Sequence, residues 1–134
     1  PIPEKQRILH PNIKYHGIIR ESERIKKVLF ESDILICPSY AEGMPTVILE
    51  AMACGCAIIA SDVGAVSLQV DNSNGWLIEP GSTKSLQQAI VNANECNKED
   101  LLQKKKNSIQ KVKDNFLWES ICSKLISEIE EKNN

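Results

Sequence analysis

The chain has 134 residues, a length that suits one domain with a modest hydrophobic core. Its formal net charge is −2, so no overall positive field favours nucleic acid. No apolar stretch reaches transmembrane length, and the first residues lack the pattern of a signal peptide. The five cysteines are odd in number and three lie in apolar runs, so we expect free thiols in the reducing cytoplasm.

Short apolar runs alternate with helical patterns along the first two thirds of the chain. Residues 1–12 have no clear period, and we expect a linker or a residual helix there. The segments that predict strands are 13–17, 33–37, 57–60 and 76–79. The segments that predict helices are 21–31, 45–54, 65–70 and 83–95. This alternation predicts an α/β fold, a Rossmann-like parallel sheet of about four strands flanked by helices.

The last third of the chain predicts helices only. Within 83–95 we expect Leu86, Ile90 and Val91 to face inward and Ser82 to cap the helix. Two more helices are expected at 98–113 and 117–132. Trp118 is expected to anchor the last helix in the core, and the run of lysines at 104–106 to lie on a solvated helix face. The expected organisation is an α/β core over 13–81 followed by C-terminal helices over 82–134.

Two acidic residues, Glu42 and Glu50, have seven residues between them and flank the start of a predicted helix. The preceding strand ends at Pro38, and Pro45 suits a first helical turn because its missing N–H has no acceptor there. Glu42 and Gly43 therefore lie in a loop at the carboxyl end of a strand, facing a helix N-terminus. Ligands of open α/β sheets bind at this place.

The predicted loop offers donors for an anion and acceptors for hydroxyl groups. Free N–H groups and the helix dipole favour a phosphate, and Gly43 has no side chain to block it. Glu50 follows on the same helix face as Thr46 and Ala53. It is the only charge among small or apolar residues, so we expect it to be at least half buried and bonded to donors such as sugar hydroxyls.

These residues resemble the C-terminal, nucleotide-sugar-binding half of GT-B glycosyltransferases of family 4, the "group 1" type. The motifs that carry the resemblance are Pro38-Ser39, Glu42-Gly43-Met44-Pro45, Glu50-Ala51-Met52-Ala53-Cys54-Gly55, Ala60-Ser61-Asp62-Val63-Gly64, Asn74-Gly75-Trp76-Leu77-Ile78-Glu79-Pro80-Gly81 and Phe116-Leu117-Trp118. Together they cover roughly residues 13 to 130.

The resemblance assigns expected roles to the residues around the loop. It implies that Glu42 is the catalytic-site acid that contacts hydroxyls of the transferred sugar. It implies that the amides of Gly43, Met44 and Thr46 line the diphosphate. Pro45, which lies between them in the chain, belongs to the same donor-binding segment. Glu50 would accept hydrogen bonds from the ribose, and backbone groups at 18–19, Ile19 above all, would line the base.

The chain also departs from the family pattern. The two further strands, the Gly-rich turn and the Arg…Lys pair that normally come first in this domain are absent from the sequence. Leu68 stands where the family usually has a Glu, which weakens any role for the loop at 64–70. We therefore expect a domain truncated on its N-terminal side, inactive alone, with an open sheet edge that permits self-association.

The sequence thus predicts the donor-binding part of a retaining hexosyltransferase of bacterial surface polysaccharide synthesis. A UDP-sugar is the favoured donor, with no cofactor and no metal, since no Asp-x-Asp sequence is present. The acceptor, a saccharide or lipid-linked glycan, would bind to another domain, and the inner membrane face is a potential location. Two alternatives remain open: a sugar-nucleotide epimerase of the same fold, and a non-catalytic nucleotide-sugar-binding or interaction module.

Overall fold

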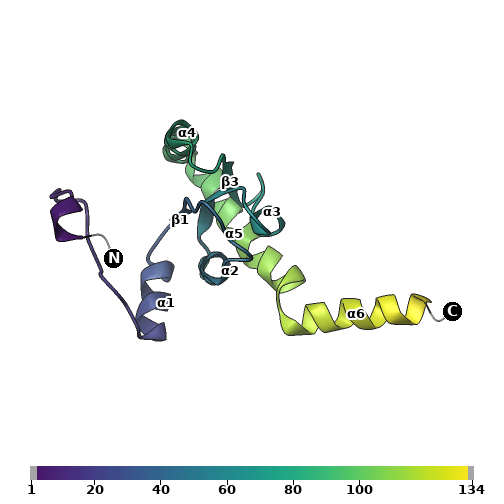
Figure 1. Cartoon of the computed structure of the whole chain (residues 1–134). Helices are drawn as coiled ribbons and strands as arrows, with labels where there is room; N and C mark the ends of the chain where they lie inside the picture. Colours follow the sequence, from purple (N-terminus) through teal and green to yellow (C-terminus); the bar gives the residue numbers. More distant parts are fainter. Residues whose placement is uncertain (1–2, 133–134) are drawn as a thin grey trace.

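The centre of the molecule is a parallel sheet with helices on both faces (Figure 1). The structure is a computed structural model and describes residues 3–132. The strands, in the spatial order β1-β2-β3, are β1 (Ile34–Cys37), β2 (Ala57–Ser61) and β3 (Gly75–Ile78). The helices are η1 (Glu4–Gln6), α1 (Ser22–Phe30), α2 (Thr46–Ala53), α3 (Val66–Gln69), α4 (Thr83–Glu95), α5 (Lys98–Asn115) and α6 (Trp118–Lys132).

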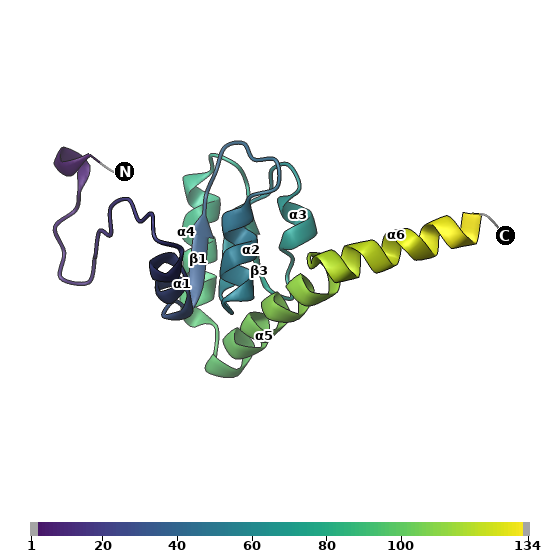
Figure 2. The same cartoon turned by 90° about the horizontal axis from the view of Figure 1, so that it is seen from below.

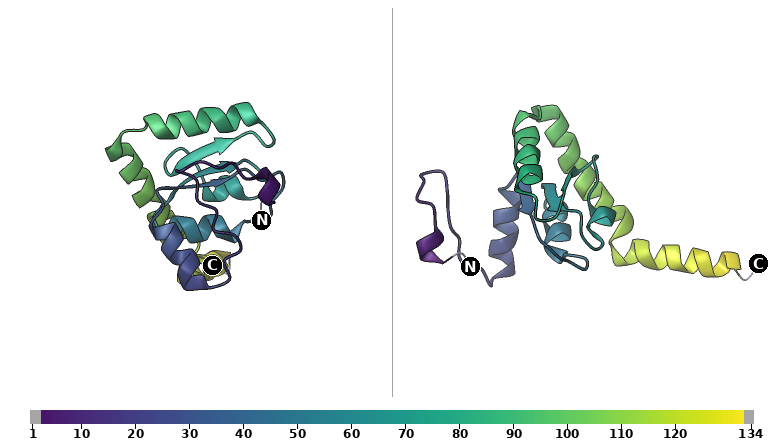
Figure 3. Two further views of the ribbon diagram at one scale, coloured as in Figure 1. Left: turned by 90° about the vertical axis from the view of Figure 1, so that its left-hand side faces the viewer. Right: turned by 45° about the horizontal axis from the view of Figure 1, so that its top comes forward.

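The sheet separates two hydrophobic clusters because side chains alternate along the central strand. Every residue of β2 is buried. Ile58 and Ala60 pack with α1, α2 and α5 on one face, whereas Ile59 packs with α4 on the other. Figure 3 (left) shows the resulting layers, with α4 on one side of the sheet and α1 and α2 on the other.

The α/β class and the parallel sheet are confirmed, but the strand expected at 13–17 does not form. A strand needs a neighbour to bond with. In the usual doubly wound order 3-2-1-4-5-6, two other strands lie between the strand before the crossover helix and the strand after it. Within residues 3–132 no strand fills those two places beside β1, so 13–17 has no strand to pair with and forms none.

The helix predictions are right in position and partly wrong in the face that packs. Ser82 accepts a hydrogen bond from the Ser85 amide, so the predicted cap of α4 is confirmed. Ile90 and Val91, however, are exposed. Helix α4 packs through Ala89 and Ala93, whose small side chains allow the helix to lie close to β2 and β3.

Helix α6 projects away from the rest of the chain (Figure 2). Trp118, expected as a core anchor, is 78% exposed, because α6 contacts α5 rather than the sheet. The exposed apolar side chains of this helix include Ile121, Leu125 and Ile129. Within residues 3–132 no helix is both long and apolar enough to cross a membrane.

Lysines of α5 hold loops at the amino ends of the strands. Of the residues 104–106 expected on a solvated face, Lys106 is exposed as expected, whereas Lys104 and Lys105 contact these loops. Lys104 lies over the Trp76 ring and donates to the Asn72 carbonyl, and Lys105 pairs with Asp33 at 2.6 Å. Lys111 pairs with Asp71 at 2.6 Å. The hydrogen bond from Lys111, with one from Ser73, lowers the pKa of Asp71 to about 2.

The Asp71–Lys111 pair predicts a pH-dependent contribution to stability. A carboxylate whose pKa is lowered on folding stabilises the native state above its unfolded value, 3.8, and this contribution is lost as the pH falls through about 2. In urea titrations, Asp71→Asn should be less stable than the wild type at pH 5, and the difference should vanish near pH 2. Lys106→Met, on the same helix as Lys111, is the control and should not show this pH dependence. A stability difference for Asp71→Asn that does not change with pH would contradict the prediction.

Candidate functional site

The loop between β1 and α2, residues 38–45, holds the first predicted site acid. Glu42 is half-buried, and the Ser39 hydroxyl donates a hydrogen bond of 2.7 Å to its Oε1. This bond fixes the position of one carboxylate oxygen, which acts as the acceptor. The loop therefore presents an oriented acceptor at the carboxyl end of the sheet.

The N-terminus of α2 follows directly and is open to solvent. Pro45 is the N-cap and is buried, and its carbonyl accepts from the Ile48 amide at 3.2 Å. The amide of Thr46 precedes the first intrahelical hydrogen bonds and has no acceptor within the helix. A Cβ placed on Gly43 would meet nothing within 4 Å, so a ligand can reach this backbone. The arrangement is a set of donors beside the carboxylate of Glu42.

A second loop, residues 62–65 after β2, packs against this backbone and holds its shape. The Ala65 amide donates to the Gly43 carbonyl at 2.8 Å. Gly64 has φ +55°, and a Cβ there would lie 2.0 Å from the Glu42 carbonyl oxygen and 2.6 Å from that of Gly43. Only glycine allows this approach.

Gln69 is a supporting residue that sequence reasoning missed. Its side chain is fully buried, and its Nε2 donates to the Pro45 carbonyl at 3.2 Å. Its own backbone carbonyl accepts from Asn74 Nδ2 at 3.0 Å. The neighbouring Leu68, at the position where the family usually has a Glu, is 63% exposed. A glutamine inside an apolar helical turn, Val66 to Val70, is the one signal in the sequence for this role.

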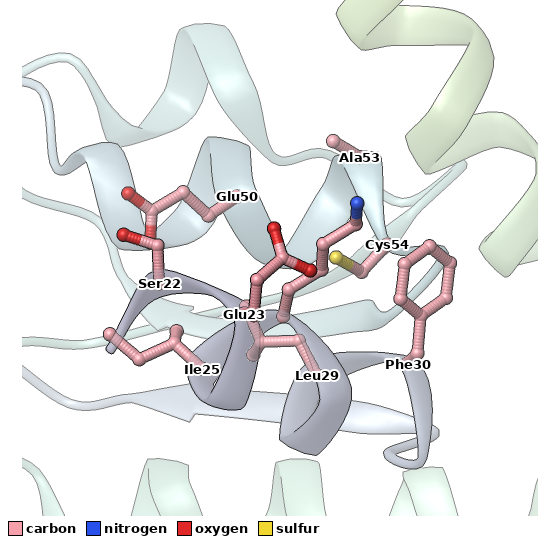
Figure 4. Close-up of a pocket in the computed structure, with 9 residues that line it drawn as sticks. Ser22, Glu23, Ile25, Leu29, Phe30, Glu50, Ala53 and Cys54 are labelled. Atoms are coloured by element: carbon pink, nitrogen blue, oxygen red, sulfur yellow. The ribbon is translucent and has the colours of Figure 1, made fainter. Parts of the chain in front are cut away.

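Glu50 lies one helical turn beyond the loop, in the wall of a hollow between α1 and α2 (Figure 4). The hollow measures about 400 Å³ and is lined by Ser22, Glu23, Ile25, Lys26, Leu29, Phe30, Glu50, Ala53 and Cys54. Glu50 is exposed, whereas the sequence predicts a carboxylate that is at least half buried. The reason is that α2 buries its opposite face, Ile48, Ala51 and Met52.

The hollow contains a cation that sequence spacing did not suggest. Lys26 of α1 lines it together with Glu50, although 24 residues separate the two in the chain. Burial raises the pKa of the Cys54 thiol, while Lys26 lowers it and Glu50 raises it. The charges of Lys26 and Glu50 therefore both reach the Cys54 thiol in the wall of the hollow. Among residues 3–132, the ion pairs involve other carboxylates, so Glu50 keeps its oxygens available.

The predicted site residues thus fall into two adjoining places. Glu42, Gly43, Met44, Pro45 and Thr46 form the loop and helix start, whereas Glu50 belongs to the hollow beside α1. Ile19 is half-buried and does not line that hollow. In the part of the chain that the structure describes, no group of three His, Cys, Asp or Glu side chains is arranged to hold a metal ion.

Comparison with known proteins identifies the family. The family model described as "Glycosyl transferases group 1" matches residues 2–95. The chain belongs to this family. Over 70 residues it is 39% identical to TuaC of Bacillus subtilis, a glycosyltransferase named for teichuronic acid biosynthesis, covering 52% of this chain and 18% of TuaC.

Solved structures show the same GT-B fold. Sucrose-phosphate synthase of Thermosynechococcus elongatus superimposes with a TM-score of 0.70 at 28% identity, covering 81% of this chain and 27% of that one. The C-terminal domain of the group 1 protein LpcC from Francisella tularensis gives 0.64 at 33%, covering 76% and 52%. Anabaena HepE, solved with UDP, gives 0.67 at 22%, covering 78% and 29%. The chain therefore spans between about a fifth and a half of these proteins.

The contact between the two loops predicts a large effect of Gly64→Ala. The new Cβ would overlap the Glu42 carbonyl, and the positive φ adds strain. We expect a loss of about 2 kcal/mol or more in the free energy of unfolding, measured by urea denaturation. Gly43→Ala is the matched control, since its Cβ would enter open space. Equal effects of the two substitutions would contradict the close contact between Gly64 and the backbone of Glu42.

Proposed function

We propose that this chain is the donor-binding part of a retaining glycosyltransferase that uses a nucleotide-diphosphate sugar. The observation that carries the proposal is the fixed carboxylate of Glu42 beside the open N-terminus of α2. Family membership supports transfer of a sugar, and the fold is the one in which HepE holds UDP. UDP is accordingly the nucleotide that we favour.

The diphosphate lies at the start of α2 in this proposal. The amides of Gly43, Met44 and Thr46 donate to its oxygens, and the helix dipole favours its negative charge. Charge on the leaving diphosphate grows as the bond to the anomeric carbon breaks. Donors already fixed in place therefore stabilise the transition state more than the ground state. The contact with Gly64 keeps these amides in position.

The two acids bind different parts of the donor in this proposal. Glu42, with Oε1 held by Ser39, accepts hydrogen bonds from hydroxyls of the transferred sugar and orients it. Glu50 accepts from the ribose hydroxyls at the mouth of the hollow, where its unpaired carboxylate is accessible. Backbone groups near Ile19 complete the base site. The donor then spans both places described above.

The remaining parts of the reaction belong to a larger protein. The acceptor hydroxyl, from a saccharide or a lipid-linked glycan, approaches from a second domain, and this chain alone has no transferase activity. Synthesis of a bacterial surface polysaccharide is the process we favour, supported by the name of TuaC. The reaction is a cytoplasmic hexosyl transfer in which the nucleotide sugar is substrate and the chain requires no cofactor.

Substitution of the two acids in the full-length enzyme tests the assignment. Glu42→Ala should lower kcat/KM by roughly a hundredfold, because orientation of the sugar is lost in the transition state. Glu50→Ala should lower it by roughly tenfold, mainly through KM for the donor, because the ribose is remote from the reacting carbon. UDP should inhibit the wild type more strongly than GDP or ADP.

Melting temperatures separate loss of contact from loss of structure. Both variants should melt within a few degrees of the wild type, since neither carboxylate is part of the core. Glu31→Ala, which removes only an exposed pair with Lys27, is the control and should transfer sugar at the wild-type rate. Full activity of Glu42→Ala would refute the role of the loop, and epimerised donor as the sole product would favour an epimerase.

A further inference from the structure

A second hollow opens at the carboxyl edge of the sheet, on the face covered by α4. It measures about 200 Å³ and is lined by Pro38, Tyr40, Ser61, Ile78, Glu79, Gly81, Ser82, Thr83 and Leu86. Pro38 and Tyr40 belong to the loop at 38–45, but none of the lining residues is among the predicted donor-site residues 42–46, and none lines the hollow around Glu50. Its volume is below the roughly 300–1,000 Å³ typical of sites for drug-sized ligands, so it suits one small molecule.

The inner wall of this hollow contains a buried hydroxyl group without a partner. Ser61, the last residue of β2, is 1% exposed, and its Oγ has no hydrogen-bond partner in the described chain. It shares the α4 face with Ile59, two residues earlier. A buried hydroxyl left unbonded destabilises the folded chain, because it has lost its bonds to water without replacement. A ligand in the hollow that bonds to Ser61 would remove this cost.

The other polar groups around the hollow include both donors and acceptors. Thr83 is the first residue of α4, so its amide has no acceptor within the helix, while the Ser82 hydroxyl is already used as the cap. The Glu79 carboxylate is exposed and only accepts. Neither lysine nor arginine lines the hollow. Glu79 therefore opposes an anion, and the groups together favour a neutral ligand that donates and accepts.

An aromatic ring forms the outer rim. Tyr40 is 81% exposed, and its ring lies so close to Gly81 that a Cβ there would be 3.0 Å from Tyr40 Cε1. Ile78 and Leu86 add apolar surface beneath the polar groups. A ring with hydroxyl groups at its edge and C–H groups on its faces matches these surfaces. Sugars have this combination of polar edge and apolar face.

We propose that this hollow is a binding site for a single neutral sugar residue, distinct from the proposed donor site. Its hydroxyls bond to Ser61 Oγ, Glu79 and the Thr83 amide, and its apolar face lies against Tyr40. The site is linked to the loop after β1 because successive residues of that loop serve both places. Tyr40 borders the hollow, whereas its neighbour Ser39 holds the carboxylate of Glu42.

Nitrogen-15 NMR of this chain tests the proposal without nucleotide and without activity. Methyl glucoside, methyl galactoside and N-acetylglucosamine are titrated separately, with sodium phosphate as the anion probe. At least one sugar should shift the amides of Ser61, Glu79 and Thr83 in a saturable manner, and phosphate should not. Ser61→Ala should weaken that binding about tenfold, the value of one good hydrogen bond.

Ser108→Ala is the matched control, because Ser108 is also fully buried with an unbonded hydroxyl but does not line the hollow. Both serine variants should unfold at equal or higher urea concentration than the wild type, since each loses an unsatisfied group. Only Ser61→Ala should lose sugar binding. The proposal is overturned if no sugar shifts these amides, if phosphate alone does, or if Ser61→Ala binds as the wild type does. The test is independent of the donor site, which the acid substitutions address.

Discussion

The close contact between two loops at the carboxyl edge of the sheet is the constraint on which the candidate site depends. Parallel pairing of β1 with β2 brings the ends of both strands to this edge. Gly64, in a conformation that other residues rarely adopt, then lets the second loop touch the backbone of Glu42 and Gly43. Without that approach, the amides before α2 would have no fixed position relative to the sheet.

Support for this edge comes from residues that do not reach a ligand. Gln69 bonds to the Pro45 carbonyl from the buried side, and Ser39 bonds to the carboxylate of Glu42 within the loop. Polar groups that are fixed before a ligand arrives need no reorganisation when charge develops. The proposed chemistry therefore rests as much on these supporting contacts as on the residues that face solvent.

Local patterns in the sequence were sufficient to predict the elements, because strand length, glycine stops and caps act over a few residues. The Ser82 cap of α4 is an example. The failures concern what packs against each element. The segment 13–17 has no strand beside it to pair with, and Trp118 lies on a helix that projects away from the sheet. Spacing along one segment contains no information about such partners.

The same limit explains the errors within the candidate site. The position of Glu42 was predictable from a strand end and a proline, whereas the exposure of Glu50 depends on which face of α2 packs in the core. Lys26 and Gln69 reach their positions only through tertiary contacts. Ser61 lies just beyond the strand predicted at 57–60, and the burial of its unbonded hydroxyl depends on tertiary packing around the end of β2.

The lysines of α5 act at the end of the sheet opposite to the candidate site. Lys105 and Lys111 hold the segments that enter β1 and β3, and Lys104 covers Trp76. Much of the side-chain anchoring is therefore remote from the surfaces offered to ligands. Residues at the ligand-facing end can change while the anchoring end stays unaltered, which suits a scaffold shared by enzymes of many specificities.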